Sequence, residues 1–195
     1  MLCLAESRKV IMVGIPGVGK TTLVSKIVEI LNSMNKSVTV QSFGTVMFEE
    51  AKKNGLQNRD ELRNLTTEEQ VKLQKMAAEK IASLNENVVI IDTHAFINTS
   101  AGYYPGLPQH VLNIIKPSNY ISVSAKPEEI YNRRMNDVTR NRDKVSISKI
   151  KKELDVQEAM ISACSVISGS PMKPIINSEG KIEEAAHKVI NAIGL

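Results

Sequence analysis

Glycines, a lysine and two threonines near the start of the chain have the spacing of a phosphate-binding loop. The run is Gly14-Ile15-Pro16-Gly17-Val18-Gly19-Lys20-Thr21-Thr22, in which four residues separate Gly14 from Gly19 and Lys and Thr follow. Glycines let such a loop turn tightly and point its N–H groups at an anion. Lys20 is placed to reach the β- and γ-phosphates of a nucleotide, and the Thr21 hydroxyl can bind Mg²⁺. From its position, we expect Thr22 to meet the α-phosphate.

The residues around this run have the context that the motif requires. The apolar run 10–13 precedes it and predicts a buried strand, and apolar residues at helical spacing follow from Leu23 to Met34. A second apolar run, 88–91, ends in Asp92. A carboxylate at the end of a buried strand can hold Mg²⁺ beside Thr21, so Thr21 and Asp92 are the predicted metal residues.

The elements needed to position these residues alternate along the chain. Further strands are expected at 38–40, 120–124 and 174–176, and helices at 46–53, 109–115, 127–135, 147–168 and from Ile182 onward. Residues 66–70 look like a capped helix start, with Thr67 three residues before Gln70. We predict one α/β domain over residues 1–195, a P-loop three-layer α/β/α fold with a parallel sheet of about five strands. Residues 95–108 and 136–145 are expected to be loops.

Composition narrows the class of protein further. The net charge of +4 fits either a nucleic-acid surface or a cleft for a polyanionic small molecule. Two cysteines, Cys3 and Cys164, are too few for a disulfide framework or a four-thiolate zinc site. No apolar run approaches the ~20 residues of a membrane span. We therefore expect a cytoplasmic protein that acts without a membrane partner.

Arginines in or beside predicted loops could serve phosphoryl transfer between two anions, because they neutralise charge and form bidentate hydrogen bonds. They are Arg59, Arg63, Arg133, Arg134, Arg140 and Arg142. Arg140 and Arg142 are the candidate catalytic pair with Lys20, because they lie in a loop without apolar periodicity. Such a loop can exclude water from the site. Arg133 is left open between this role and a solvated helix face.

Six segments together resemble the archaeal type of adenylate kinase over nearly the whole chain. They are the glycine-rich run 14–22, Phe43-Gly44-Thr45-Val46-Met47-Phe48-Glu49, Asn58-Arg59-Asp60, Val89-Ile90-Ile91-Asp92-Thr93-His94, Gly102-Tyr103-Tyr104-Pro105-Gly106-Leu107-Pro108 and Thr139-Arg140-Asn141-Arg142-Asp143. The glycine-rich run is generic by itself. The Phe-Gly-Thr and Pro-Gly-Leu-Pro segments are more specific.

The resemblance implies reversible, Mg²⁺-dependent conversion of ATP and AMP to two ADP. It implies an AMP-binding insertion at about 43–66 and a short lid at about 136–146. The implied AMP residues are Thr45, Arg59, Arg63, His94 and Gln109. Arg134, which is implied to bind ATP, belongs with Arg140 and Arg142 to this implied lid over the ATP phosphates, and the turn at Asn177 is implied to lie against adenine. A homo-oligomer, often a trimer, is also implied.

The chain departs from that family pattern at two places, and other functions stay open. Residues 102–108 lack the Arg that bacterial relatives use for the AMP phosphate, and Val156-Gln157 and Met160-Ile161 replace a His-Gln and an Asn-Arg pair. The protein could instead be a kinase for another nucleoside monophosphate. A nucleotide-switched ATPase-like protein associated with RNA or ribosomes is the other alternative, although we do not expect a nucleic-acid partner.

Overall fold

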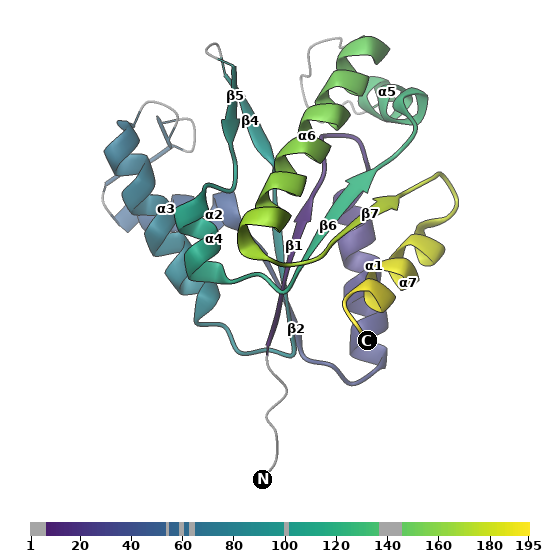
Figure 1. Cartoon of the computed structure of the whole chain (residues 1–195), viewed down its shortest axis with the longest axis horizontal. Coiled ribbons are helices and arrows are strands. Elements are labelled where there is room, and N and C mark those ends of the chain that lie inside the picture. Colours follow the sequence, from purple (N-terminus) through teal and green to yellow (C-terminus); the bar gives the residue numbers. More distant parts are fainter. Residues whose placement is uncertain (1–6, 54, 59–60, 63–64, 100–101, 137–145) are drawn as a thin grey trace.

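The chain folds around one parallel sheet (Figure 1). The computed structural model describes residues 7–53, 55–58, 61–62, 65–99, 102–136 and 146–195. The strand order is β2-β3-β1-β6-β7, and every neighbouring pair is parallel. The strands are β1 (Arg8–Val13), β2 (Val38–Ser42), β3 (Val88–Thr93), β6 (Asn119–Ser124) and β7 (Met172–Ile176). The predicted five-stranded parallel sheet is confirmed.

Helices cover both faces of this sheet, because the central strands alternate apolar side chains between two cores. In β1, Val10 and Met12 join a core with α1 (Lys20–Ser33) and α7 (Ile182–Ala192). Ile11 and Val13 join the opposite core with α3 (Thr67–Ala82) and α4 (Gln109–Ile115). Apolar runs buried on both faces are what a covered parallel sheet requires. The predicted three-layer arrangement is therefore confirmed.

The other helices follow the predicted ranges closely. They are α2 (Phe43–Lys53), α5 (Pro127–Asn136) and α6 (Ile147–Ser168). Helix α2 begins three residues before the expected start at Val46, directly after β2, because Phe43 is already buried in the core of its face. Most of the predicted lid, residues 137–145, lies outside the described residues. Among the described helices, none is long and apolar enough to cross a membrane.

A β-hairpin occupies part of the segment 95–108, which the sequence predicted to be a loop. Strands β4 (Phe96–Thr99) and β5 (Gly102–Pro105) pair antiparallel and extend beyond the sheet (Figure 1). The Phe96 and Tyr103 rings meet edge to face with their centroids 4.8 Å apart. This cross-strand aromatic contact stabilises a two-stranded ribbon that is too short and too polar to show clear periodicity.

The N-cap of helix α3 lies one residue earlier than the predicted cap. Thr66 is the N-cap: its hydroxyl accepts a hydrogen bond from the Glu69 N–H, and the Glu69 carboxylate accepts from the Thr66 N–H at 2.9 Å. The prediction that Thr67 caps against Gln70 is wrong. Both Thr66 with Glu69 and Thr67 with Gln70 have the three-residue spacing of a capping box. Glu69 completes the capping box here, and its negative charge also suits the positive N-terminal end of the helix.

Candidate phosphate-binding and phosphoryl-transfer site

The glycine-rich run forms a compact loop between β1 and α1. Gly17 and Gly19 have φ of 91° and 80°, in the left-handed region that side chains disfavour. The Val18 N–H donates to the Ile15 carbonyl at 3.3 Å, and the Leu23 N–H donates to the Gly19 carbonyl at 3.0 Å, which starts α1. The loop therefore leads directly into a helix N-terminus, an arrangement that favours a bound phosphate.

Lys20 lies inside the loop with its side chain 10% exposed. Its Nζ forms an ion pair with Asp92 and donates to the Thr93 carbonyl at 2.6 Å. Burial lowers the pKa of Lys20 from its ordinary value, and the Asp92 carboxylate opposes that shift. The charged amine is thus held at the end of β3, close to where nucleotide phosphates would lie.

The two predicted metal residues line one hollow. A cavity of about 400 Å³ is lined by Thr21 and Asp92 together with Val24, Ser25, Val28 and Val40. The described residues include no group of three or more His, Cys, Asp and Glu side chains that could hold a metal. A hydroxyl and a carboxylate still fit Mg²⁺, which takes one or two protein oxygens and completes its shell with phosphates and water.

Two consecutive arginines of α5 contact the outside of the loop. The Arg134 Nε donates to the Pro16 carbonyl at 2.7 Å, and its guanidinium forms an ion pair with Glu153 at 2.8 Å. Arg133 donates to the Gly17 and Val18 carbonyls at 3.4 and 3.3 Å. Arg133 therefore contacts the loop, with its side chain 29% exposed.

Asn177, at the end of β7, contacts the same loop. Its side chain Nδ2 donates to the Val18 carbonyl at 2.9 Å and to the Gly19 carbonyl at 3.4 Å. Sequence reasoning placed the turn at Asn177 against the adenine but missed this contact with the loop. The one available signal was a polar residue directly after a predicted strand.

The predicted AMP residues that the structure describes lie at the carboxyl edge of the sheet. Thr45 is exposed in the first turn of α2, and Gln109 is exposed at the first position of α4. His94 follows β3, and its Nδ1 lies 3.3 Å from the Gly14 carbonyl. The other predicted residues, Arg59, Arg63, Arg140 and Arg142, lie outside the described residues.

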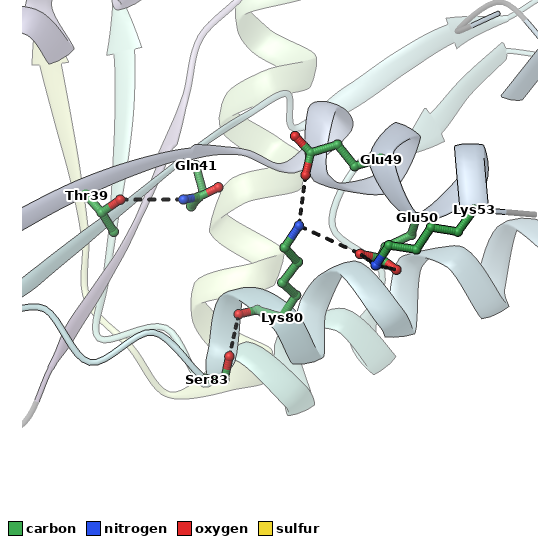
Figure 2. Close-up of polar contacts among 7 residues, drawn as sticks. All are labelled: Thr39, Gln41, Glu49, Glu50, Lys53, Lys80 and Ser83. Carbon is green, nitrogen blue, oxygen red and sulfur yellow. Dashed lines mark hydrogen bonds and ion pairs between the residues drawn. The ribbon is translucent and has the colours of Figure 1, made fainter. Parts of the chain in front are cut away.

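Ion pairs fix α2, which carries Thr45, against α3 (Figure 2). Lys80 of α3 lies between two carboxylates of α2, with its Nζ 2.8 Å from Glu49 and 3.7 Å from Glu50. Lys53 contacts Glu50 from the same helix at 2.8 Å. The Glu50 side chain is only 6% exposed, so these contacts also compensate a buried charge.

Two of the four α6 positions compared with the family pattern are buried: Gln157, which matches the pattern, and Ile161, which departs from it. The Gln157 side chain, 2% exposed, donates to the Ser122 hydroxyl and to the Val123 carbonyl, each at 3.1 Å. Ile161 is fully buried among apolar side chains. In this chain the Ile161 position therefore serves packing between α6 and the sheet.

The sheet order, the loop at the end of β1 and the carboxylate at the end of β3 together define a P-loop nucleotide-binding fold of the kinase type. Two solved structures support the fold, both titled shikimate kinase. The one from Acinetobacter baumannii, in complex with shikimate, has a TM-score of 0.54 at 13% identity and covers 97% of this chain and 94% of that one. The one from Aquifex aeolicus has a TM-score of 0.55 at 16% identity and covers 95% of each chain.

Closer relatives define the family. A family model described as an AAA domain matches residues 13–151. A protein named adenylate kinase from Thermoplasma acidophilum is 41% identical over 186 residues, 95% of this chain and 98% of the relative. One of the same name from Methanocaldococcus jannaschii is 38% identical over 190 residues, 96% of this chain and 99% of the relative. The chain belongs to the adenylate kinase family, within the wider family of that P-loop domain.

Proposed function

We propose that this protein catalyses the reversible transfer of a phosphoryl group between ATP and AMP, which gives two molecules of ADP. The observation that carries the proposal is the ion pair of the buried Lys20 with the partly exposed Asp92, between a P-loop and the carboxyl end of the sheet, which also carries Thr45, His94 and Gln109. A protein that only binds and hydrolyses ATP as a switch needs the P-loop with its Lys20–Asp92 pair, but not the other polar residues. A second group of polar side chains on the same edge supports a second nucleotide.

The reaction is a displacement at the γ-phosphorus of ATP. An oxygen of the AMP phosphate forms the new bond, and the bond from the γ-phosphorus to the β,γ-bridging oxygen breaks, so ADP leaves as the second ADP forms. Lys20 exchanges Asp92 and the Thr93 carbonyl for β- and γ-phosphate oxygens, while N–H groups of the loop 14–22 bind the phosphate chain. Arg140 and Arg142 then stabilise the charge on the transferred group.

The remaining predicted residues bind and orient the two nucleotides. Thr45, Arg59 and Arg63 bind AMP, with His94 and Gln109 on the far side of its site. Arg134 acts on the ATP side next to the loop. Thr21 and Asp92 would hold Mg²⁺, which supplies charge neutralisation of the phosphates when it is bound. Residues 136–146 close over the ATP phosphates and keep water from the reacting group.

We further propose a cytoplasmic homo-oligomer, a trimer by family resemblance. A cytoplasmic location is supported by the lack of a membrane-spanning helix among the described residues and by the free thiol of Cys164. Two neighbouring aliphatic side chains near the end of α6, Val166 and Ile167, are 82% and 54% exposed. Such exposure is compatible with a covered surface between subunits.

The test of function supplies ATP with each of four acceptors, AMP, CMP, UMP and GMP, and follows ADP formation. We expect ADP to form with AMP at a rate well above ATP hydrolysis without an acceptor. Formation with a pyrimidine monophosphate and none with AMP would reassign the acceptor. Slow ATP hydrolysis with no transfer to any acceptor, together with salt-sensitive RNA binding, would favour the switch function instead.

A further inference from the structure

The outer side of the P-loop is held by side chains from two other elements. Four consecutive carbonyls, those of residues 16–19, accept hydrogen bonds from Arg134, Arg133 and Asn177. These donors lie more than 100 residues along the chain from the loop. The loop conformation is therefore set from outside as well as by its glycines.

Asn177 is the best-fixed of the three donors. The residue is 5% exposed, and its own N–H donates to the Ser124 carbonyl at 2.7 Å. Its carbonyl accepts a hydrogen bond from Arg133 at 3.3 Å. With both backbone groups bound, the residue is held in place, and its side-chain Nδ2 contacts the Val18 and Gly19 carbonyls.

A fixed carbonyl also fixes the N–H that follows it. In a trans peptide the C=O of one residue and the N–H of the next point in opposite directions within one plane. Asn177 holds the Val18 and Gly19 carbonyls on the outer side of the loop, together with Arg133 at Val18 and the Leu23 N–H at Gly19. The N–H groups of Gly19 and Lys20 are thereby directed to the inner side, where phosphate oxygens would lie.

Asn177 lies so close to Gly19 that a side chain at position 19 would have no room. A Cβ on Gly19 would come within 2.6 Å of the Asn177 Nδ2, in addition to the strain of its positive φ. Asn177 and Gly19 therefore fit each other, and the pair joins β7 to the start of α1.

We propose that Asn177 is a positioning residue for the ATP triphosphate: it holds the P-loop carbonyls outward so that the N–H groups of Gly19 and Lys20 meet the phosphates. This rests on the proposed function only in that ATP occupies the loop. It differs from the adenine contact that the family resemblance implies for this turn, because the effect acts on the phosphates whatever base is attached.

The test measures the Kd of three ligands in the presence of Mg²⁺: a non-hydrolysable ATP analogue, inorganic tripolyphosphate and AMP. Asn177→Ala is compared with Asn119→Ala. Asn119 is a matched control, because it also donates to a backbone carbonyl, that of Ala192 at 3.2 Å, but lies at the start of β6, away from the loop. We expect Asn177→Ala to weaken the ATP analogue and tripolyphosphate alike, by about tenfold, and to leave AMP unchanged.

The other outcomes overturn the inference. Loss of affinity for the ATP analogue with tripolyphosphate unchanged would mean an adenine contact. Unchanged affinity of Asn177→Ala for both the ATP analogue and tripolyphosphate would mean a structural role only. The same holds if Asn177→Ala loses affinity for AMP to an equal extent, or if Asn119→Ala shows an equal loss. If Asn177→Ala does not fold, Asn177→Ser serves instead, because its hydroxyl is one bond short of the amide nitrogen but keeps a polar group there. If the wild-type protein binds the ATP analogue and tripolyphosphate but transfers nothing to AMP, the proposed function is contradicted and the role of Asn177 is not.

Discussion

Lys20 combines two requirements that conflict. It must be charged to bind phosphates, yet it is buried, and burial lowers its pKa. The ion pair with Asp92 and the hydrogen bond to the Thr93 carbonyl pair the buried amine. The same carboxylate is the proposed Mg²⁺ ligand, so nucleotide binding would release Asp92 for the metal.

Replacement of Lys20 tests this account at the residue scale. We expect Lys20→Ala to lower the rate of transfer by at least about 10²–10³-fold, because a preorganised charge at the transferred group is lost. The fold should remain, since Asp92 is partly exposed and can be hydrated. Steady-state kinetics and circular dichroism measure the two effects.

Lys26→Ala is the matched control for that substitution. Lys26 lies on the same helix, where it pairs with Glu29 and Glu183 at the surface. Its removal should change the transfer rate less than twofold, because exposed ion pairs contribute little. Equal losses in the two variants would contradict the role assigned to Lys20.

The start of helix α3 depends on the side chain of its N-cap, Thr66. The capping box of Thr66 and Glu69 satisfies N–H groups that have no partner within the helix. Its hydrogen bonds also lower the pKa of Glu69. A carboxylate with a lowered pKa stabilises the fold above its ordinary pKa of 4.5, and that contribution is lost as the pH falls through the lowered value.

Two neighbouring threonines allow a direct test of this cap. We expect Thr66→Ala to destabilise the protein by about 1 kcal/mol at neutral pH, because the N-cap acceptor is lost. Thr67→Ala, one residue later, should cost much less. Chemical unfolding at pH 7 and pH 4 measures both, and the gap between the variants should narrow at the lower pH. If Thr67→Ala destabilises the protein more than Thr66→Ala does, Thr67 would be the N-cap, as the sequence alone predicted.

The elements also show what could be predicted from the sequence. Buried strands and long helices were predicted correctly, because continuous apolar runs and helical periodicity are local patterns. The hairpin of β4 and β5 was missed, since each strand has four residues and the stabilising contact joins Phe96 to Tyr103. The loop residues and Asp92 were found from a motif and its context.

Other contacts of the site leave no local pattern. Arg133 and Asn177 reach the P-loop across 116 and 159 residues of chain. Only the folded sheet, which sets β7 beside β6 and β6 beside β1, brings these side chains to the loop. Motifs therefore identify the residues of the loop itself better than the residues that contact its outer side.

In the whole molecule, the sheet brings the predicted site residues that the structure describes to its carboxyl end. The ends of β1 and β3 carry the loop and Asp92, and α2 and α4 bring Thr45 and Gln109 to the same edge. Polar residues in a crevice at the carboxyl ends of parallel strands are the usual site of ligands in this kind of fold.

The proposed oligomer can be tested on the whole molecule. If the family resemblance extends to assembly, light scattering should give about three times the chain mass of 21.5 kDa. A mass equal to one chain across the working concentration range would contradict the trimer but not the transfer reaction.

A site that binds two nucleotides at once and exchanges one phosphoryl group between them must also act on ADP alone. The protein is incubated with ADP as the only substrate, in the presence of Mg²⁺, and ATP, AMP and inorganic phosphate are measured over time. We expect ATP and AMP to appear in equal amounts, without matching release of phosphate, and Lys20→Ala to form neither. Release of phosphate without ATP, or no reaction of the wild-type protein, would contradict the proposed transfer.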